Sequence, residues 1–461
     1  MNPSQHVHFV GIGGYGMSAI ARVMLDMGYV VSGSDVQRKD LTDNLCERGA
    51  TVYIGHKATN VNGANVVVYS TGVPQDNVEL RTAAEKDIPL LHRSEMLAKL
   101  LNERHGIAVA GAHGKTTTSS MIAQVMSECG VDPTYIIGGE VVGLGGNAKA
   151  GKSEYVVAEA DESDGSFLQY YPYIGIVTNI EADHLENYDG SFQKLKQAYK
   201  QFLGQVRADG AAIVCGDDTY VQELLPDIQT ETVTYGMAEE VDYRASHIHY
   251  TNGSTTFLVW ERGERLGEAA LSVPGRHNVY NALATIATCR RIGLSFQHVT
   301  RALPMFRGTK RRFQLMGEVN GITIVDDYAH HPTEITATIE AAKSYGKRIV
   351  AVFQPQRYSR TYFLLDAFSR AFKEADEVVI TSIYSPVGEA RIEGVSSERL
   401  TDLIRQNSNS NVTFCKTNDD VKHYLLETVR PGDLVLTMGA GDIWTVAKAL
   451  SQQLTANSKD N

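Results

Sequence analysis

The sequence predicts an α/β protein built from three domains, and three observations lead to this fold class. Short apolar runs rich in β-branched residues alternate with helix-length segments, which is typical of parallel sheets covered by helices. The alternation occurs in two separate series, with a turn-rich segment between them. The chain has 461 residues, which is enough for about three domains of ordinary size.

The two series of apolar runs give the expected strands. A run of this kind, bounded by glycine or polar residues, predicts a buried strand. The first series is VHFV (7–10), NVVVYS (65–70), IAVAG (107–111), YVVAEA (155–160), IGIVTN (174–179) and AAIVCG (211–216). The second series is ITIVDD (322–327), RIVAVF (348–353), EVVITS (377–382) and DLVLTM (433–438), and it predicts a separate C-terminal α/β unit.

The segment from about 230 to 275 has a different pattern. It predicts short antiparallel strands that turn at Asn252-Gly253 and at Gly263. We therefore expect a small antiparallel β subregion within a central domain whose sheet is otherwise mainly parallel.

The domain boundaries are expected near residues 105 and 314. The basic run GTKRRF (308–313) lies just before the second series, so it is interpreted either as a linker or as a solvated loop. The polar tail SQQLTANSKDN (451–461) is expected to fray. The expected domains are 1–105, 106–314 and 315–461.

Composition and charge disfavour several classes of protein. A net charge of -11 argues against a large nucleic-acid-binding surface. No apolar run approaches the roughly 20 residues of a membrane span, and the N-terminus enters a glycine motif at once instead of a signal peptide. The five cysteines stand singly, which fits a reducing compartment. We therefore expect a cytoplasmic protein with no nucleic-acid partner and no membrane insertion.

The first motif is GIGGYGM, which follows the first expected strand. Gly11 allows a tight turn, Gly13 a close approach of the backbone to a diphosphate, and Gly16 close helix packing, while Asp35 ends the next apolar segment. Such a Rossmann fingerprint is compatible with NAD, FAD or any nucleoside diphosphate, and also with a plain β-α turn.

The second motif is GAHGKTTTSS (111–120), between an apolar run and a helix-like segment. Backbone N–H groups at a helix N-terminus attract phosphate, and a glycine turn lets the phosphate approach closely. Lys115 would supply a cation and Thr116 a magnesium-facing hydroxyl. Only Ala112 and His113 separate the two glycines, so the loop is a shortened variant of the P-loop.

Two later strand ends supply candidate ligands for a metal ion. Glu159 lies in VVAEADESD and His184 in TNIEADH, and strand ends of an open α/β sheet gather at one edge. Nucleotide chemistry needs magnesium near the terminal phosphates, held by hard ligands. We therefore expect both groups to converge on Lys115 and Thr116, although a buried structural carboxylate and a helix-capping histidine are the alternatives.

Two motifs follow later in the chain. In PGRHNVYNALATIA (274–287), Asn278 and Asn281 share a helix face near His277 and can read a purine edge, although the motif taken alone favours a capped core helix. In QPQRYSRT (354–361), Arg357 and Arg360 are three residues apart, so on a helical turn both can grip one carboxylate or phosphate, or else form solvated surface.

Taken together, GIGGYGM, GAHGKTTT, EADESDGSF, TNIEADHLENY, PGRHNVYNALA, GTKRRFQ, DDYAHHPTE and QPQRYSRT resemble, in this order, the Mur ligases of bacterial peptidoglycan synthesis. The resemblance covers nearly the whole chain. It implies a Rossmann-like N-terminal domain for a UDP-sugar, a central P-loop-type ATPase domain, and a Rossmann-like C-terminal domain on the amino-acid side that closes over the site.

The resemblance also implies a reaction. The lactoyl carboxylate of UDP-N-acetylmuramate takes the γ-phosphoryl group of ATP, and the amine of L-alanine attacks the resulting acyl phosphate with magnesium present. The family's later-acting members carry a carbamylated lysine shortly after the DH motif, where this chain has Tyr199 followed by Lys200. That difference agrees with the alanine-adding branch and leaves a second metal site open.

The resemblance assigns roles to residues of this sequence. The ATP set is Gly111, Ala112, His113, Gly114, Lys115, Thr116, Thr117, His277, Asn278, Asn281, Arg312, Asp326 and Asp327, and the metal set is Thr116, Glu159 and His184. The UDP-sugar and substrate set is Gly11, Gly13, Gly14, Gly16, Asp35, His56, Ser70, Thr71 and Tyr328. The catalytic set is Lys115, His184, Glu159, Arg357, Arg360 and His330, with the arginines on the alanine carboxylate.

Three alternatives remain open from the sequence. A ligase of the same superfamily that recycles murein tripeptide has a related motif set, although EADESDGSF fits the synthetic ligase better. An NAD-dependent oxidoreductase would use GIGGYGM and Asp35 but leaves Lys115, Glu159 and His184 without a role. A nucleotide-driven switch would use the lysine loop but has no need of a third domain with strand-end arginines.

Overall fold

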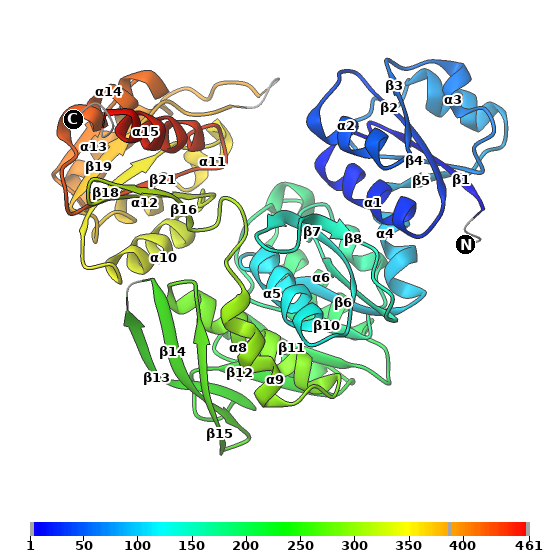
Figure 1. Cartoon of the computed structure of the whole chain (residues 1–461), viewed down its shortest axis with the longest axis horizontal. Helices are drawn as coiled ribbons and strands as arrows, with labels where there is room; N and C mark the ends of the chain where they lie inside the picture. The colour runs from blue at the N-terminus through cyan, green and yellow to red at the C-terminus, as the bar shows by residue number, and fades with distance from the viewer. Residues whose placement is uncertain (1–3, 252, 386–388, 458–461) are drawn as a thin grey trace. The chain divides into compact units, whose positions relative to one another are not determined.

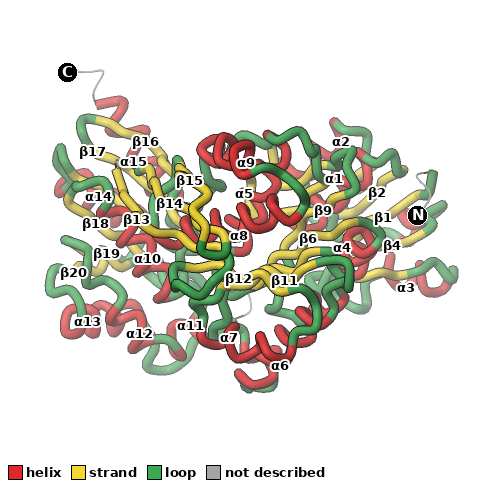
Figure 2. The backbone as a smooth tube through the Cα atoms, turned by 90° about the horizontal axis from the view of Figure 1, so that it is seen from below, coloured by secondary structure: helices red, strands yellow, loops and turns green. Residues whose placement is uncertain are grey.

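The computed structural model describes residues 4–251, 253–385 and 389–457. The chain divides into two compact units, and each contains mainly parallel β-sheet with helices against it (Figures 1 and 2). The first unit comprises Met1–Ser246, Leu258–Glu268 and Tyr280–Phe306. The second comprises His247–Phe257, Ala269–Val279 and Arg307–Asn461.

The first sheet of the first unit is parallel, in the order β3-β2-β1-β4-β5. Its strands are β1 (His6–Val10), β2 (Val30–Asp35), β3 (Thr51–Ile54), β4 (Val66–Tyr69) and β5 (Leu90–His92). The helices between them are α1 (Tyr15–Asp26), α2 (Asp40–Glu47), η1 (Ala58–Val61), α3 (Val78–Glu85) and α4 (Arg93–Asn102). Val7 and Phe9 pack with α1 and α4, whereas Val10 packs with Leu80 of α3, so helices cover both faces.

The second sheet has the order β15-β14-β13-β12-β11-β10-β6-β9-β7-β8. Its strands are β6 (His105–Ala110), β7 (Thr134–Val141), β8 (Gly146–Lys149), β9 (Tyr155–Glu159), β10 (Ile174–Val177), β11 (Ala211–Cys215), β12 (Thr232–Gly236), β13 (Tyr243–Thr251), β14 (Ser254–Glu261) and β15 (Glu264–Leu271). The helices are α5 (Lys115–Glu128), η2 (Ser166–Gln169), η3 (Leu185–Tyr188), α6 (Phe192–Gly204), α7 (Thr219–Leu224), η4 (Leu225–Asp227), α8 (Arg276–Arg291), α9 (Phe296–Ala302) and η5 (Leu303–Met305).

The core of this second sheet explains why its central strands carry small apolar residues. Phe202 of α6 is buried in one cluster with Ala108 of β6 and Val177 of β10. Helix α5 contacts β6, β7 and β9 and buries Met121 and Val125. Strands covered by helices need apolar residues that point both ways, which accounts for the continuous apolar runs in the sequence.

The antiparallel subregion corresponds to β13, β14 and β15. The predicted turn at Gly263 joins β14 to β15, and both Arg262 and Gly263 have positive φ angles, 50° and 85°, as a tight hairpin requires. The other predicted turn includes Asn252, which lies outside the described residues.

The sheet of the second unit has the order β16-β17-β21-β18-β19-β20. Its strands are β16 (Gln314–Val319), β17 (Ile322–Asp327), β18 (Arg348–Phe353), β19 (Glu377–Ile380), β20 (Val412–Phe414) and β21 (Asp433–Met438). Its helices are α10 (Pro332–Lys343), α11 (Tyr358–Phe363), α12 (Leu365–Arg370), α13 (Ser397–Asn407), α14 (Asn418–Thr428) and α15 (Trp444–Asn457). All its strand pairs are parallel except the edge pair β16–β17.

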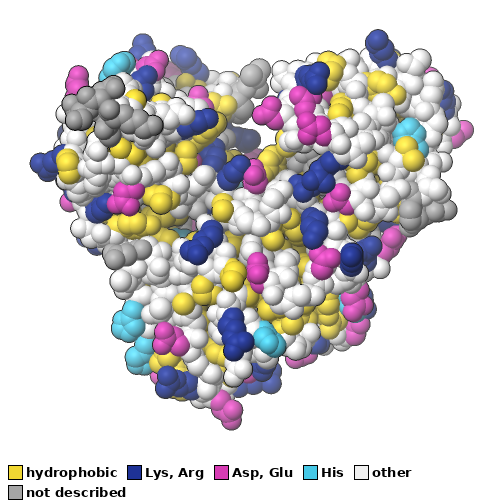
Figure 3. Space-filling model, in the orientation of Figure 1, with side chains coloured by type: hydrophobic (Ala, Val, Ile, Leu, Met, Phe, Trp, Pro, Cys, Tyr) yellow, Lys and Arg dark blue, Asp and Glu magenta, His cyan; other side chains and the backbone are white. Residues whose placement is uncertain are grey.

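The predicted fold class is confirmed, with strands at every apolar run of both series. The prediction of a frayed tail is wrong for most of that segment, because α15 extends to Asn457 and Leu454 packs against the hydrophobic cluster on the sheet. Within the described ranges, no helix is both long and apolar enough to cross a membrane. On the face drawn in Figure 3, basic and acidic side chains are intermingled.

Candidate active site

The lysine loop occupies the turn between β6 and α5. Gly111 has φ 135° and Gly114, the residue that caps α5, has φ 86°, so both adopt backbone conformations that side chains rarely allow. A Cβ atom on Gly111 would lie 2.0 Å from Thr178 Oγ1, and one on Gly114 would lie 2.8 Å from Asn281 Oδ1. The two glycines are therefore required both by the backbone and by the close approach of neighbouring segments.

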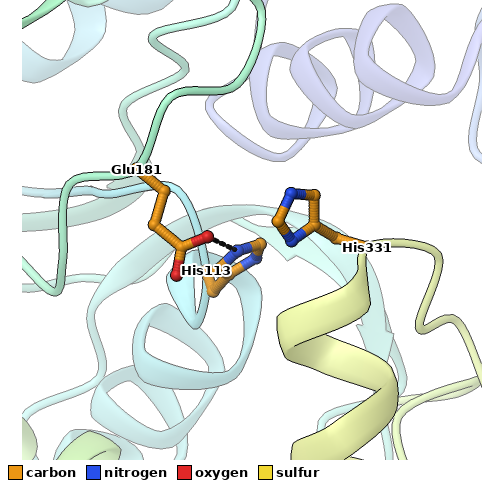
Figure 4. A group of neighbouring side chains, drawn as sticks. All are labelled: His113, Glu181 and His331. Carbon is orange, nitrogen blue, oxygen red and sulfur yellow. Dashed lines mark hydrogen bonds and ion pairs between the residues drawn. The ribbon is translucent and has the colours of Figure 1, made fainter. Parts of the chain in front are cut away.

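The end of β10 fixes the shape of this loop. The carbonyl oxygen of His113 accepts hydrogen bonds from Thr178 Oγ1 at 2.6 Å and Asn179 Nδ2 at 3.0 Å. The His113 amide donates to Asn179 Oδ1 at 2.9 Å, and its Nε2 lies 3.2 Å from Glu181 Oε2 (Figure 4). Three side chains from TNIEADH thus hold one residue of the lysine loop.

Lys115 begins α5 and points back into the loop. Its Nζ donates to the Gly111 carbonyl at 2.5 Å and to Glu162 Oε1 at 2.9 Å. Burial on its own would lower the pKa of Lys115, but Glu162, Asp161 and Glu159 together raise it above its usual value. The ammonium group is therefore charged and held by an internal carboxylate.

Glu159 ends β9, where it faces the same region as Lys115. Its Oε1 accepts a hydrogen bond from the Gly138 amide at 2.5 Å. Burial raises the pKa of the carboxyl, while the Gly138 amide, Lys115 and the Thr116 hydroxyl act in the opposite direction. Glu159 and Thr116 are thus neighbours, and together they offer the hard oxygen ligands that magnesium prefers.

His184 is the residue before η3, in a left-handed conformation with φ 54°. Its imidazole lies 3.5 Å from Asp183 Oδ2 and 3.7 Å from Glu186 Oε1. Among the described residues, no hydrogen bond joins His184 to Lys115, Thr116 or Glu159. Hydrogen bonds and charge interactions therefore connect Lys115, Thr116 and Glu159, whereas the ion pairs of His184 are with Asp183 and Glu186 of its own segment.

Two of the residues predicted on the adenine side, Asn281 and Asn278, form hydrogen bonds within the protein. Asn281 is 5% exposed, and its Oδ1 accepts a hydrogen bond from Thr118 Oγ1 at 3.1 Å, which ties α8 to α5. Asn278 is also 5% exposed and donates to the Pro274 carbonyl at 2.6 Å, so it closes the turn before α8. Burial lowers the pKa of His277 to about 4, so its imidazole is neutral near pH 7.

The glycine motif of the first sheet is held by its neighbour β2. The Gly11 amide donates to the Ser34 carbonyl at 2.8 Å, and the Gly13 amide donates to Asp35 Oδ2 at 2.9 Å. Asp35 is 4% exposed, so it braces the turn instead of pointing to solvent. Gly16 packs against Arg93, with Nη1 3.1 Å from the position of a Cβ atom.

The other predicted UDP-sugar residues lie at the carboxyl ends of β3 and β4. His56 follows β3, and its Nδ1 lies 2.9 Å from Ser34 Oγ. Ser70 and Thr71 directly follow β4, in a turn closed by a hydrogen bond from the Val73 amide to the Ser70 carbonyl at 3.0 Å. The carboxyl edge of a parallel sheet is where such folds bind ligands.

In the second unit, the pair Asp326 and Asp327 ends β17. Asp326 is fully buried and accepts hydrogen bonds from Arg311 Nε at 3.2 Å and Thr437 Oγ1 at 2.7 Å. Asp327 accepts from the amides of Phe313 and Ala329, both at 2.6 Å, and burial raises its pKa to about 6. Both carboxylates therefore already serve the local structure.

The basic run 308–313 is anchored instead of being a free loop. Arg311 has a positive φ of 61°, and its Nη2 donates to the Gly439 carbonyl at 2.5 Å and its Nη1 to the Gly441 carbonyl at 3.1 Å. Together with the Asp326 contact, these bonds fix the run to the ends of β17 and β21. The interpretation as a solvated loop is therefore wrong for Arg311.

The remaining predicted residues of the second unit surround Tyr328. Arg312 lies over the Tyr328 ring, with its guanidinium carbon 5.2 Å from the ring centroid, and the His330 ring packs edge-on at 5.3 Å. Burial lowers the pKa of His330 to about 4, with Arg360 acting in the same direction and Glu334 against it. His330 is therefore a neutral imidazole close to a carboxylate and an arginine.

The two predicted arginines do not lie on one helical turn. Arg357 precedes α11 with a positive φ of 67°, and only Arg360 lies within the helix. Arg360 Nη1 donates to Gln356 Oε1 at 2.8 Å. The sequence predicted that both arginines follow β18, but it did not predict that the helix begins only after Arg357.

Sequence reasoning missed several residues that build the site. They are Glu162, Thr178, Asn179 and Glu181 around the lysine loop, and Arg311 in the second unit. Glu162, Thr178, Asn179 and Glu181 lie inside the quoted motifs EADESDGSF and TNIEADHLENY, so their proximity to the chosen residues was the available signal.

Comparison with known families agrees with this arrangement. The model described as "Mur ligase family, catalytic domain" matches residues 6–105, "Mur ligase middle domain" matches 109–289, and "Mur ligase, glutamate ligase domain" matches 311–441. The chain belongs to the Mur ligase family. The predicted resemblance is thereby confirmed, and the lysine loop with Glu159 and His184 lies in the Mur ligase middle domain.

Individual Mur ligases are similar over nearly the whole length. The chain is 48% identical to the UDP-N-acetylmuramate--L-alanine ligase of Symbiobacterium thermophilum, across 99% of this chain and 96% of the relative. Among solved structures, UDP-N-acetylmuramate-alanine ligase MurC from Thermotoga maritima has a TM-score of 0.80 at 29% identity, covering 98% of this chain and 99% of that one. A murein peptide ligase from Psychrobacter arcticus has a TM-score of 0.68 at 25% identity, with the same coverage.

Proposed function

We propose that the protein is an ATP-dependent ligase that joins L-alanine to UDP-N-acetylmuramate in peptidoglycan precursor synthesis. The observation that carries this proposal is the 48% identity, over 99% of the chain, to a UDP-N-acetylmuramate--L-alanine ligase. A murein peptide ligase has a similar fold but lower structural similarity, so the recycling reaction is the second candidate.

The lysine loop can stabilise the charge that develops in this reaction. A carboxylate is a poor acylating agent, so its oxygen first attacks the γ-phosphorus of ATP and ADP leaves. The amine of alanine then attacks the acyl carbon, phosphate leaves, and the amine gives up a proton. Lys115 and the amides at the start of α5 offset the negative charge of the transferring phosphoryl group.

Magnesium fits the donors next to Lys115. Glu159 and Thr116 provide a carboxylate and a hydroxyl at adjoining strand and helix ends, which is a hard oxygen set. We assign these two residues, with His184, to the metal. When bound, the ion neutralises charge on the phosphates. Gly111, Ala112, His113, Gly114 and Thr117 are assigned to the nucleotide as the loop around them.

The remaining assignments concern the UDP-sugar, the ATP side and the acceptor amino acid. The glycine motif with Asp35, His56, Ser70 and Thr71 is assigned to the UDP-sugar. Arg312, Asp326, Asp327, His277, Asn278 and Asn281 are assigned to the ATP side, with Asp326 and Asn281 acting through the residues that they hold. Tyr328, His330, Arg357 and Arg360 are assigned to the acceptor side.

The domain boundaries and location belong to the same proposal. We place a UDP-sugar domain at 1–105, an ATP-binding domain at 106–314 and an amino-acid-side domain at 315–461. The reaction is placed in the cytoplasm, supported by five cysteines that are all free thiols. The partners are small molecules, with no nucleic acid.

One assay tests the reaction. ADP release that requires both UDP-N-acetylmuramate and L-alanine is the expected result. A requirement for a murein tripeptide in place of alanine would favour the recycling ligase. Nucleotide turnover that ignores both substrates would indicate a switch, and hydride transfer to NAD would indicate an oxidoreductase.

Arg360 provides a test of the acceptor side. Arg360→Ala is expected to raise the KM for L-alanine roughly tenfold or more, because one charge-assisted contact to the amino-acid carboxylate is lost. The KM for ATP should change much less. Arg370→Ala is the matched control, since Arg370 is an exposed arginine of α12 paired with Asp366. An alanine KM that is equal in both variants would remove Arg360 from the acceptor site.

A further inference from the structure

The first sheet contains a carboxylate with no exposure to solvent and a full set of hydrogen-bond donors. Glu79 of α3 is 0% exposed. Its Oε1 accepts from Asn60 Nδ2 at 2.6 Å and from the Lys57 amide at 3.1 Å. Its Oε2 accepts from Ser34 Oγ at 2.5 Å and lies 3.3 Å from His8 Nε2. Each oxygen therefore has two partners, which is the capacity of an ionised carboxylate.

The carboxylate is negatively charged under all ordinary conditions. Burial on its own would raise the pKa of Glu79, but the hydrogen bonds from His8, Ser34, Asn60 and Lys57 lower it to about 2. An ionised carboxylate can only accept hydrogen bonds. The proton on every bond around Glu79 must therefore come from the partner.

This requirement sets the direction of a chain of hydrogen bonds that leads to His56. The single hydroxyl hydrogen of Ser34 is donated to Glu79 Oε2, and the two oxygen atoms are 2.5 Å apart. Ser34 Oγ also lies 2.9 Å from His56 Nδ1, so the oxygen accepts and Nδ1 carries the hydrogen. In a neutral imidazole with Nδ1 protonated, Nε2 has a free lone pair. His56 Nδ1 also lies 3.6 Å from Glu79 Oε2, which favours the same proton position, so the buried charge selects the tautomer of His56 mainly through Ser34.

His56 is the point at which this buried chain reaches the surface. Its side chain is 20% exposed, whereas that of Glu79 is 0% exposed. It lies two residues beyond β3, at the carboxyl edge of the sheet where the glycine motif turns, and the neighbouring Gly55 amide donates to the Asp35 carbonyl at 2.8 Å. Ligands of parallel sheets bind outside this edge.

We propose that Glu79 is a positioning residue which, through Ser34, presents His56 Nε2 as a hydrogen-bond acceptor to the nucleoside of the UDP-sugar. The group that it recognises is a hydrogen-bond donor, which the uracil ring offers as N3–H and the ribose as hydroxyls. This inference rests on the proposed function, because it takes the UDP-sugar as the ligand of the first sheet.

The same strand supplies a matched control. Ser32, two residues before Ser34 on β2, is 3% exposed and lies 2.7 Å from His8 Nδ1 and 2.7 Å from His6 Nε2. Like Ser34, it is a buried serine with two side-chain partners. The partners of Ser32 are two histidines, whereas those of Ser34 are a carboxylate and a histidine. Ser32 reaches Glu79 only indirectly, because His8 Nε2 lies 3.3 Å from Glu79 Oε2, and Ser32 is not the serine that contacts His56.

The first experiment compares Ser34→Ala with Ser32→Ala in the full-length protein. We expect Ser34→Ala to raise the KM for UDP-N-acetylmuramate roughly tenfold with little change in kcat, since one ligand contact loses its orientation. Ser32→Ala should leave that KM within about twofold. Equal KM values for the two variants would overturn the proposal and leave Glu79 as a structural group only.

The second experiment observes the tautomer. Two-bond proton–nitrogen NMR spectra of protein labelled with ¹⁵N-histidine, with the His56 signals identified from His56→Gln, should show Nε2 unprotonated. Glu79→Gln introduces an amide that can donate to Ser34 Oγ. Ser34 can then donate to His56 Nδ1, so the hydrogen of the neutral imidazole should move to Nε2. An unchanged His56 signal in folded Glu79→Gln, or protonated Nε2 in the unaltered protein, would overturn the proposal.

Substrate analogues identify the donor. A UDP-N-acetylmuramate with N3-methyluracil should bind weaker than the natural substrate to the unaltered protein and equally to Ser34→Ala, if uracil is the donor. A 2′-deoxyribose analogue should show the same pattern if the ribose is the donor. Full sensitivity of Ser34→Ala to both changes would contradict the proposal. Failure of the proposed function has a different signature, because the unaltered protein would then not use UDP-N-acetylmuramate at all.

Discussion

Replacing Lys115 with alanine is expected to lower kcat for ligation by roughly a thousandfold while the UDP-sugar still binds. The ammonium group is the cation of the lysine loop, and its Nζ lies 2.9 Å from Glu162 and 2.5 Å from the Gly111 carbonyl. The glycine motif that we assign to the UDP-sugar lies in another sheet. ADP release measures the first effect, and calorimetric titration with UDP-N-acetylmuramate measures the second.

Controls separate this chemistry from folding. Lys149→Ala is the matched surface variant, because Lys149 is 47% exposed and paired with Asp132, and its activity should stay normal. Removing Lys115 leaves Glu162 buried without its partner, so Lys115→Met combined with Glu162→Gln restores a neutral pair. That double variant should fold and remain inactive. Recovery of activity in it, or lost UDP-sugar binding with retained ATPase activity in Lys115→Ala, would contradict the assignment.

Gly111→Ala is expected to reduce ligation by about a hundredfold or more, because even a 1 Å displacement of catalytic groups has effects of that size. A Cβ atom at Gly111 would lie 2.0 Å from Thr178 Oγ1 and 3.1 Å from the Asn179 amide nitrogen. These two residues hold the His113 carbonyl, so the clash moves the loop that carries Lys115.

Gly130→Ala is the control for the effect of a positive φ angle without a steric clash. Gly130 also has a positive φ, 80°, but a Cβ atom there would meet no other atom within 4 Å. Its alanine variant should lose about 1–2 kcal/mol of stability and keep its activity. Thermal unfolding and ADP release, measured on both variants, give the comparison. Similar activities in Gly111→Ala and Gly130→Ala would show that the contact with Thr178 does not control the loop.

The fold was predictable because its strongest signals are local. Buried parallel strands need continuous apolar runs, and each such run in this sequence became a strand. The glycine turns after β1 and β6 were also visible, since positive φ angles and close contacts leave glycine as the residue that fits. The tail was mispredicted because its polar residues masked the single leucine, Leu454, which packs against the core and continues α15.

The contacts of the site were less predictable because they depend on pairings between distant segments. Nothing near Lys115 in the sequence indicates Glu162, 47 residues away, as its partner. Asp326 had the position of a ligand-binding strand end, but the fold uses it to hold Arg311. Glu79 lies in an ordinary helix start, NVEL, and its role emerges only when β2, η1 and α3 meet around it.

The ion pair between Lys115 and Glu162 has a consequence for product release. Glu162 serves as a built-in substitute for the anion that the lysine loop attracts, so any incoming phosphate must displace it. A polydentate triphosphate with its metal can meet that cost, whereas a single phosphate ion gains much less from the exchange. We therefore expect Glu162 to pair with Lys115 again after phosphate has left, and we expect free inorganic phosphate to inhibit the protein only weakly.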